Sequence, residues 1–584
     1  VDPNAFETLL PSKRAILFNA GISRPLGPFS ASLSLNAAST ESSALRGLPM
    51  ASVVLPGDNP WSPFADDVLL VRPLAGGRAL RNENSAQTLG ATFNLTGRLS
   101  GWQLTLSGSY LRSWTDSLLE QGIDLGRVQG LLDAGDPTLN PYGPWSSTLL
   151  LANRNRSRGQ SISGRINVGK TLVELPAGPL TANVAITLGR NVQENRSTGN
   201  NGTLVTNRRT NQFDGQAALS IPISRRTKGA IGPLGDLTLD LLAGGRSMAG
   251  GSLQRRYGGG FTWAPTDFFQ LRGTMENVDA APSSDQLDGP VVTTINRIFD
   301  FARQESIDVV WIVGGNPALR RGRRQSRALN AMVRPLSDQT LTLNFGYSAQ
   351  TAKGGVAGFP ELTPAIEAAF PERIVRDAAG HLVSVDARPI NLANESSSEL
   401  SSGIALRLPR RASGPSNGGA TQAVATTANP AIWTLSLNYR RRLTSTLLPR
   451  AGLPVIDLLG GDSGQPREFL TMQFSVGKRG MGASLNGNWN GGARLRNGAS
   501  GGVDYRFSPS STLNLSLFVE PERILRDAAK YPWLNNLKLT LDVRNLFDAY
   551  RHVRLADGSV PMGYSRDEID PLGRTVRLSL RKRF

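Results

Sequence analysis

Residues 537–544 read Leu-Lys-Leu-Thr-Leu-Asp-Val-Arg, with an apolar side chain at every second position. A period of two places the apolar side chains on one face of a β-strand and the polar side chains on the other. The same alternation occurs at 341–347, 433–439 and 470–476. The chain is therefore predicted to be all-β.

Extending this criterion along the chain predicts nineteen strands. They lie at 14–24, 29–38, 86–98, 102–114, 158–173, 180–196, 207–224, 236–249, 252–264, 268–278, 323–335, 340–351, 395–408, 431–443, 467–478, 481–491, 496–507, 536–546 and 574–584. Helical periodicity is confined to short pieces near 363–370 and 523–530.

The connections between these strands alternate in length. Short ones lie at 25–28, 99–101 and 265–267, whereas 115–157 and 279–322 are long. Short turns at one end and long loops at the other are typical of outer-membrane barrels. We therefore expect a large transmembrane antiparallel β-barrel, with about 22 strands in the intact protein and roughly 19–22 here. A soluble β-array would show a repeat of about 40–50 residues, and the sequence has none.

Composition excludes several other classes of protein. The 584 residues contain no cysteine and only two histidines, so thiol catalysis, disulfide scaffolds and multi-histidine metal sites are excluded. The net charge of +18 comes from basic residues that are scattered along the chain, and we therefore expect no nucleic-acid partner.

The C-terminal segment carries a family resemblance. Residues 536–550 contain Asn545-Leu546-Phe547-Asp548, and the last strand ends on the aromatic Phe584. This resembles the end of TonB-dependent outer-membrane receptors, in which a terminal aromatic residue is the signal for the barrel-assembly machinery. Residues 271–276 and 315–319 are similar to mid-barrel passages of the same family. The second departs from the family pattern, because Arg320-Arg321 stands where an acidic ending is usual.

The resemblance implies an active transporter in the outer membrane of a Gram-negative bacterium. It would take up a scarce solute (a siderophore, oligosaccharide or peptide) with energy from TonB–ExbB–ExbD, and would contact the lipid bilayer and lipopolysaccharide. Residues 1–584 are expected to be the barrel, with a plug domain upstream of residue 1 that TonB engages. The alternatives are a passive plugless porin, or a barrel scaffold for a partner such as a surface lipoprotein.

Loop residues supply the candidate ligand-binding site. Aromatic side chains near arginines in the long loops could form a substrate vestibule, and packing that orders the loops is the competing interpretation. The candidates are Trp61, Tyr142, Trp145, Trp311, Arg320 and Arg321. We expect no enzyme activity and no catalytic, cofactor or metal residues.

Two apparent motifs are set aside. Residues 164–171 match a phosphate-binding loop, but their alternation continues as a strand and Pro176 prevents a following helix. Residues 461–464 lack the strand-to-helix elbow of a serine hydrolase.

Overall fold

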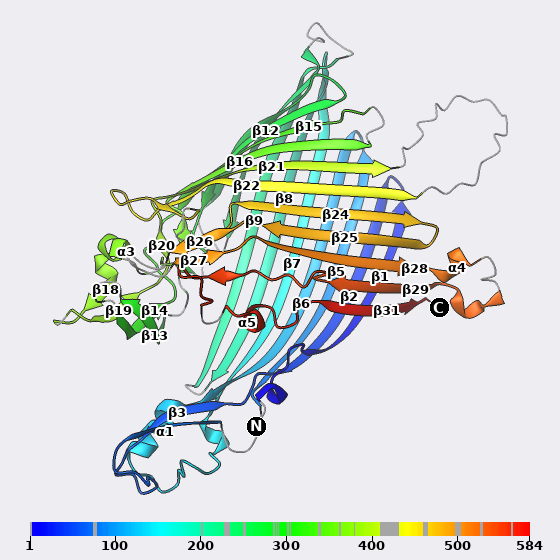
Figure 1. The fold of residues 1–584 in the computed structure, drawn as a ribbon. Helices are drawn as coiled ribbons and strands as arrows, with labels where there is room; N and C mark the ends of the chain where they lie inside the picture. The colour runs from blue at the N-terminus through cyan, green and yellow to red at the C-terminus, as the bar shows by residue number, and fades with distance from the viewer. Residues whose placement is uncertain are drawn as a thin grey trace. The chain divides into compact units, whose positions relative to one another are not determined.

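The fold is described from a computed structural model (Figure 1). It describes residues 3–73, 79–199, 202–226, 234–248, 253–283, 286–287, 289, 291–300, 303, 305–336, 340–360, 362, 364–378, 380–408, 431–459, 465–496, 504–525, 530–561 and 564–583. Phe584 and the 461–464 segment lie outside these residues.

Twenty of the described strands form one antiparallel sheet, in agreement with the predicted fold class. Its strands are β1 (Ser12–Leu26), β2 (Phe29–Leu45), β5 (Arg81–Leu99), β6 (Trp102–Ile123), β7 (Leu150–Leu175), β8 (Gly178–Gly199), β9 (Gly202–Ser224), β10 (Asp236–Met248), β11 (Gln254–Ala264), β12 (Phe269–Ala280), β15 (Gly322–Val333), β16 (Leu341–Lys353), β21 (Asn394–Leu408), β22 (Ile432–Leu448), β23 (Ile456–Asp457), β24 (Glu468–Lys478), β25 (Met481–Asn490), β28 (Ser510–Val519), β29 (Leu537–Arg544) and β31 (Thr575–Lys582).

The remaining elements are short and lie in the connections. The strands are β3 (Met50–Leu55), β4 (Val68–Pro73), β13 (Val292–Asp300), β14 (Glu305–Val313), β17 (Val356–Ala357), β18 (Ile374–Arg376), β19 (Leu382–Asp386), β20 (Ile390–Asn391), β26 (Ala493–Arg496), β27 (Asp504–Phe507) and β30 (Val553–Arg554). The helices are α1 (Leu125–Asp133), α3 (Pro364–Ala369), α4 (Pro521–Ile524) and α5 (Arg566–Ile569), with 3₁₀ turns η1 (Pro3–Phe6), η2 (Ser147–Leu149), η4 (Pro371–Arg373) and η6 (Pro532–Leu534). Among the described residues, no helix has the length and hydropathy needed to cross a membrane.

The chain divides into two compact units, which are described separately. The first unit comprises residues 1–171, 182–217 and 245–253, and the second comprises 172–181, 218–244 and 254–584.

In the first unit, strand register separates apolar from polar side chains. One row across β1, β2, β5, β6 and β7 consists of Ala20, Leu35, Ala91, Tyr110 and Ile162. The next row, on the opposite face, consists of Gly21, Ser34, Thr92, Ser109 and Ser163. The apolar face suits lipid and the polar face suits a water-filled lumen.

Several strands of the first unit are longer than a bilayer requires. β6 has 22 residues and β7 has 26, whereas about 9–11 residues span a bilayer. Beyond the apolar rows the same face becomes charged: Arg154 donates from Nε to Asp116 at 2.9 Å, and Arg156 donates to the same carboxylate at 3.0 Å. The outer part of these strands is therefore built for water or lipid headgroups.

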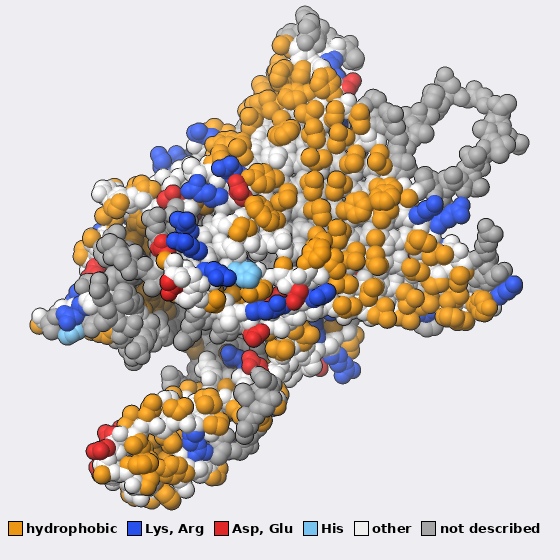
Figure 2. All heavy atoms as spheres, viewed as in Figure 1, with side chains coloured by type: hydrophobic (Ala, Val, Ile, Leu, Met, Phe, Trp, Pro, Cys, Tyr) orange, Lys and Arg blue, Asp and Glu red, His pale blue; other side chains and the backbone are white. Residues whose placement is uncertain are grey.

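The second unit repeats the two-faced arrangement. Leu406, Leu435, Phe474, Leu485 and Leu515 form an apolar row, and Ala405, Ser436, Gln473, Asn486 and Asn514 form the adjacent polar row. Figure 2 shows hydrophobic side chains over the surface at β22, β24 and β25.

One predicted strand is wrong. The described residues of 496–507 do not belong to the large sheet, because β26 and β27 pair with each other and β27 pairs with β30 in a three-stranded sheet. The sheet strand in this region is β28, which follows Pro509. Every other predicted segment overlaps a strand of the large sheet.

Candidate functional site

The long connections fold into three small modules. Module A comprises residues 46–73 and 124–149, module B the described residues of 291–321 and 354–393, and module C the described residues of 491–509 and 545–574. Alternate connections of an antiparallel meander lie at the same edge of a sheet, so the two segments of each module start from the same edge.

Module A has its own hydrophobic core. The β3–β4 hairpin alternates so that Ala51, Val53 and Leu55 are at most 3% exposed, and they pack in one cluster with Val128 and Leu132 of α1. Helix α1 begins where the Asp124 carboxylate accepts a hydrogen bond from the Arg127 amide at 3.0 Å.

Trp145 is a packing residue of module A. It is buried in this core, and its indole Nε1 donates to the Asn140 carbonyl at 3.0 Å. The Arg72 guanidinium lies over the ring, 5.5 Å from its centroid. By contrast, Trp61 is 39% exposed and Tyr142 is 48% exposed, so both can contact a ligand.

Module B contains the four-stranded sheet β13, β14, β19 and β18 together with α3 (Figure 1). Val309, Leu382 and Val385 of the sheet and Ile366 of α3 form a buried core, against which Trp311 packs. Trp311 therefore lies within the folded body of the module.

A buried ion cluster joins the elements of module B. Arg376 donates from Nε and Nη2 to both oxygens of Glu367 at 2.6 and 2.9 Å, and from Nη1 to Asp300 at 2.7 Å. Asp300 is 1% exposed. The carboxylates of Glu367 and Asp300 raise the pKa of Arg376 above its ordinary value.

A second pair in module B has redundant arginines. Arg388 donates from Nε and Nη2 to Asp386 at 2.8 and 2.7 Å, and Arg373 Nη1 lies 3.5 Å from the same carboxylate. Burial raises the pKa of Asp386, but the hydrogen bonds from Arg388 and the two nearby positive charges outweigh it, so the pKa is lowered.

Arg320 and Arg321 are exposed where module B re-enters the sheet at β15. The Arg320 backbone is held by Asn391, whose Oδ1 accepts from the Arg320 amide and whose Nδ2 donates to the Arg320 carbonyl, both at 2.8 Å. The six predicted residues thus divide between modules A and B, and those two modules belong to different compact units.

Module C contains the 545–548 motif, which builds a turn. Asn545 donates from Nδ2 to the Ala549 carbonyl at 2.8 Å and accepts from the Ala549 amide at 2.9 Å. Asp548 accepts from Arg566 and from the Arg574 amide, and these bonds lower the pKa of Asp548. Asn545 and Asp548 have positive φ angles of 50° and 56°, which Asn and Asp tolerate better than most residues.

Module C also holds an aromatic cluster that the sequence did not identify. Tyr564 lies 5.8 Å from Tyr505 and 6.1 Å from Phe507, between ring centroids. The Arg551 guanidinium lies over Phe507 at 4.5 Å. The sequence offered little signal for this cluster, because its members are up to 59 positions apart, Tyr505 to Tyr564.

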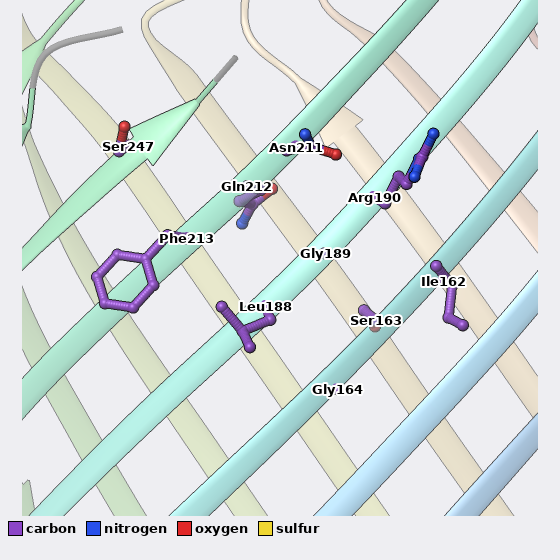
Figure 3. A pocket seen from close by; sticks show the side chains of 10 residues that line it. All are labelled: Ile162, Ser163, Gly164, Leu188, Gly189, Arg190, Asn211, Gln212, Phe213 and Ser247. Carbon is purple, nitrogen blue, oxygen red and sulfur yellow. The ribbon is translucent and has the colours of Figure 1, made fainter. Parts of the chain in front are cut away.

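Figure 3 shows a cavity of about 480 Å³ on the sheet of the first unit. Its lining combines apolar side chains, among them Ile162, Leu188 and Phe213, with polar ones, among them Arg190, Asn211 and Ser247. Ile162 belongs to the apolar row described above and Ser163 to the polar row, so the lining of this cavity includes residues of both faces. In the part of the chain that the structure describes, no group of three or more His, Asp or Glu residues is placed to hold a metal ion.

Comparison with known proteins supports the fold. No family model matches the sequence, and no curated protein matches it. The outer-membrane transporter YddB from Escherichia coli has a TM-score of 0.55 and 10% identity, over 97% of this chain and 75% of that chain. The ferripyoverdine receptor of the Pseudomonas aeruginosa outer membrane has a TM-score of 0.52 and 10% identity, over 92% and 61%.

The FpvAI–pyocin S2 complex gives a TM-score of 0.52 at 10% identity over 92% of this chain, which spans 62% of the matched chain's length. These similar structures are receptors and a transporter, not enzymes. The chain therefore has the β-barrel fold of these outer-membrane proteins.

Proposed function

We propose that the chain is the barrel of an outer-membrane transporter that captures a scarce solute and imports it with energy delivered through TonB. The observation that carries this proposal is the construction of the loop end, where modules with buried cores present exposed aromatic and arginine side chains. A core that holds such side chains in place reduces the entropy lost on binding, and this favours high-affinity capture. Fold alone does not establish function, so the proposal needs a direct test.

The energy-coupling part of the proposal concerns the whole protein. We propose a plug domain upstream of residue 1 that closes the lumen and is engaged by TonB–ExbB–ExbD. Capture by the outer loops would favour one plug conformation, and TonB would shift the plug to another. The polar rows of Ser, Thr, Asn and Gln would then line the solute's path.

A ferric siderophore is the first solute class to test, because one similar structure is a receptor bound to ferripyoverdine. An oligosaccharide or a peptide is next. The test expresses the intact gene in a host with TonB and in an isogenic host without it, and measures ⁵⁵Fe uptake from a panel of ferric siderophores. We expect saturable uptake that requires both the gene and TonB.

Other results would select the alternatives. Equal entry with and without TonB, together with constitutive conductance in a planar bilayer, would make the protein a passive porin. A second chain that copurifies in stoichiometric amount, with no uptake, would make it a scaffold.

Variants of module A separate binding from packing. Trp61→Ala and Tyr142→Ala should weaken solute capture while the module stays folded, because both side chains are exposed. Trp145→Ala should instead unfold the module and raise its protease sensitivity. Unchanged capture in the Trp61→Ala/Tyr142→Ala double variant would remove these two residues from the proposed site.

A further inference from the structure

Arg551 in module C differs from the other arginines described in the loop modules. Its Nε and Nη2 atoms are shielded from solvent and have no hydrogen-bond partner. The guanidinium stacks on Phe507, and burial lowers the pKa of Arg551, an effect only partly offset by the phenol of Tyr564. A partly buried cation with shielded, unpaired nitrogens is unfavourable unless an anion compensates it.

The geometry of the guanidinium indicates which anion fits. Nε and Nη2 lie on one edge, and their N–H bonds point in parallel, as a two-oxygen acceptor requires. The same edge of Arg388 holds both oxygens of Asp386, and the same edge of Arg376 holds both oxygens of Glu367. In Arg388 and Arg376 the Nε–Nη2 edge binds a carboxylate, whereas in Arg551 the same edge has no hydrogen-bond partner.

The surroundings of Arg551 favour a ligand. Tyr505, Phe507 and Tyr564 form aromatic walls beside the guanidinium. The flanking residues Tyr550 and His552 contact each other with ring centroids 4.1 Å apart, and the Arg566 guanidinium lies over Tyr550. Arg566 is paired with Asp548, whereas the Nε and Nη2 atoms of Arg551 have no partner.

We propose that Arg551 binds an oxyanion, a carboxylate or phosphate group, through Nε and Nη2 within the aromatic walls of module C. The further step, that this oxyanion belongs to the captured solute, rests on the proposed function. Because both nitrogens are shielded, binding requires side chains of module C to move, and the bound anion then orders residues on both sides of Arg551.

The experiment uses the purified chain in detergent micelles, with inorganic phosphate as the probe and chloride at the same ionic strength as the reference. Hydrogen exchange is followed by mass spectrometry in peptides that cover 545–561. At phosphate concentrations several times its Kd we expect exchange there to slow about 5-fold, since a ligand that binds only the folded form stabilises it by mass action.

Three variants make the result specific. Arg551→Gln should abolish the slowing and should leave exchange in chloride unchanged or slower, because it removes an uncompensated cation. Arg551→Lys keeps the charge but lacks the two-nitrogen edge, so it should lose at least half of the effect. Arg554→Gln is the matched control: it removes one positive charge from an exposed position nearby and should keep the full effect.

Two results would overturn the proposal. One is the absence of slowing in the unmodified protein, or equal slowing in Arg551→Gln. The other is faster exchange of Arg551→Gln in chloride, which would make the guanidinium a structural member of module C.

Phosphate binding does not depend on TonB, so a failure of this site and a failure of the transport proposal are distinguishable. Repeating the measurement on the intact protein identifies the source of the anion. Protection already present in chloride would assign the oxyanion to another part of the protein instead of to a solute.

Discussion

Replacing Arg376 by leucine should open module B while the sheet stays intact. The variant leaves Asp300, 1% exposed, without the guanidinium that now donates to both of its oxygens. Removing one partner of a buried ion pair costs about 3–5 kcal/mol. At 1.4 kcal/mol per factor of ten, local opening should become roughly 140- to 3,700-fold more frequent.

Hydrogen exchange at β19 is the assay, because Val385 of this strand is fully buried in the module's core. Exchange there should accelerate by the factor above, and peptides from β24 should be unaffected. The matched control is Arg388→Leu. Asp386 then keeps Arg373 nearby, so the loss should stay within about 1 kcal/mol.

A double variant, Asp300→Leu/Arg376→Leu, tests the reason for the effect. It also removes the buried carboxylate that the single variant deprives of the Arg376 guanidinium, and replacing both partners by apolar residues is often neutral. The double variant should recover most of the lost protection. Equal acceleration in the single and double variants would refute the argument, as would an unchanged rate in Arg376→Leu.

Three more outcomes follow from the structure. Leu485→Arg places a charge on the lipid face and should cost about 2–4 kcal/mol near the bilayer centre, whereas Asn486→Arg on the polar face should cost little; urea unfolding in lipid vesicles compares them. Gly573→Ala should destabilise module C, because a Cβ would stand 2.3 Å from Asp548 Oδ1 at φ +55°, and faster exchange in 564–574 would report it. The folded-state pKa of Asp386 is lowered, so its contribution to the stability of module B is present above the unfolded pKa of about 4 and is lost as the pH falls through the lower folded-state pKa. Proteolysis of module B should therefore increase as the pH falls below about 4, and a constant rate would contradict this.

The large sheet could be predicted because its information is local. In β24, the alternation from Leu470 to Val476 predicts which side chains share the apolar face, and the pairing of β24 with β25 agrees with this prediction. The error at 496–507 arose because β26 and β27 have only four residues each, too few to show a clear period.

The loop modules could not be predicted in the same way. The β3 segment alternates at Ala51, Val53 and Leu55, but the helix that buries these side chains begins at Leu125. The local sequence of neither segment indicates that the two pack together. The burial of Trp145, a predicted ligand candidate, could not be predicted for the same reason, because its core includes residues of β3 that are far away in the sequence. Arg551 was missed because its burial depends on Phe507, in a different connection of the sheet.

The polar face of the sheet has a consequence for permeation. Its rows carry neutral hydroxyl and amide groups, such as Thr434 and Ser475, whose oxygens are 2.5 Å apart. The same face also carries charged residues, among them the cross-strand neighbours Asp542 and Arg577. Groups of this kind exchange hydrogen bonds with water and with a polar solute at similar energies. A solute moving along the neutral rows would therefore meet neither a deep trap nor a high barrier, whereas the charged side chains on this face would attract or repel a solute according to its charge.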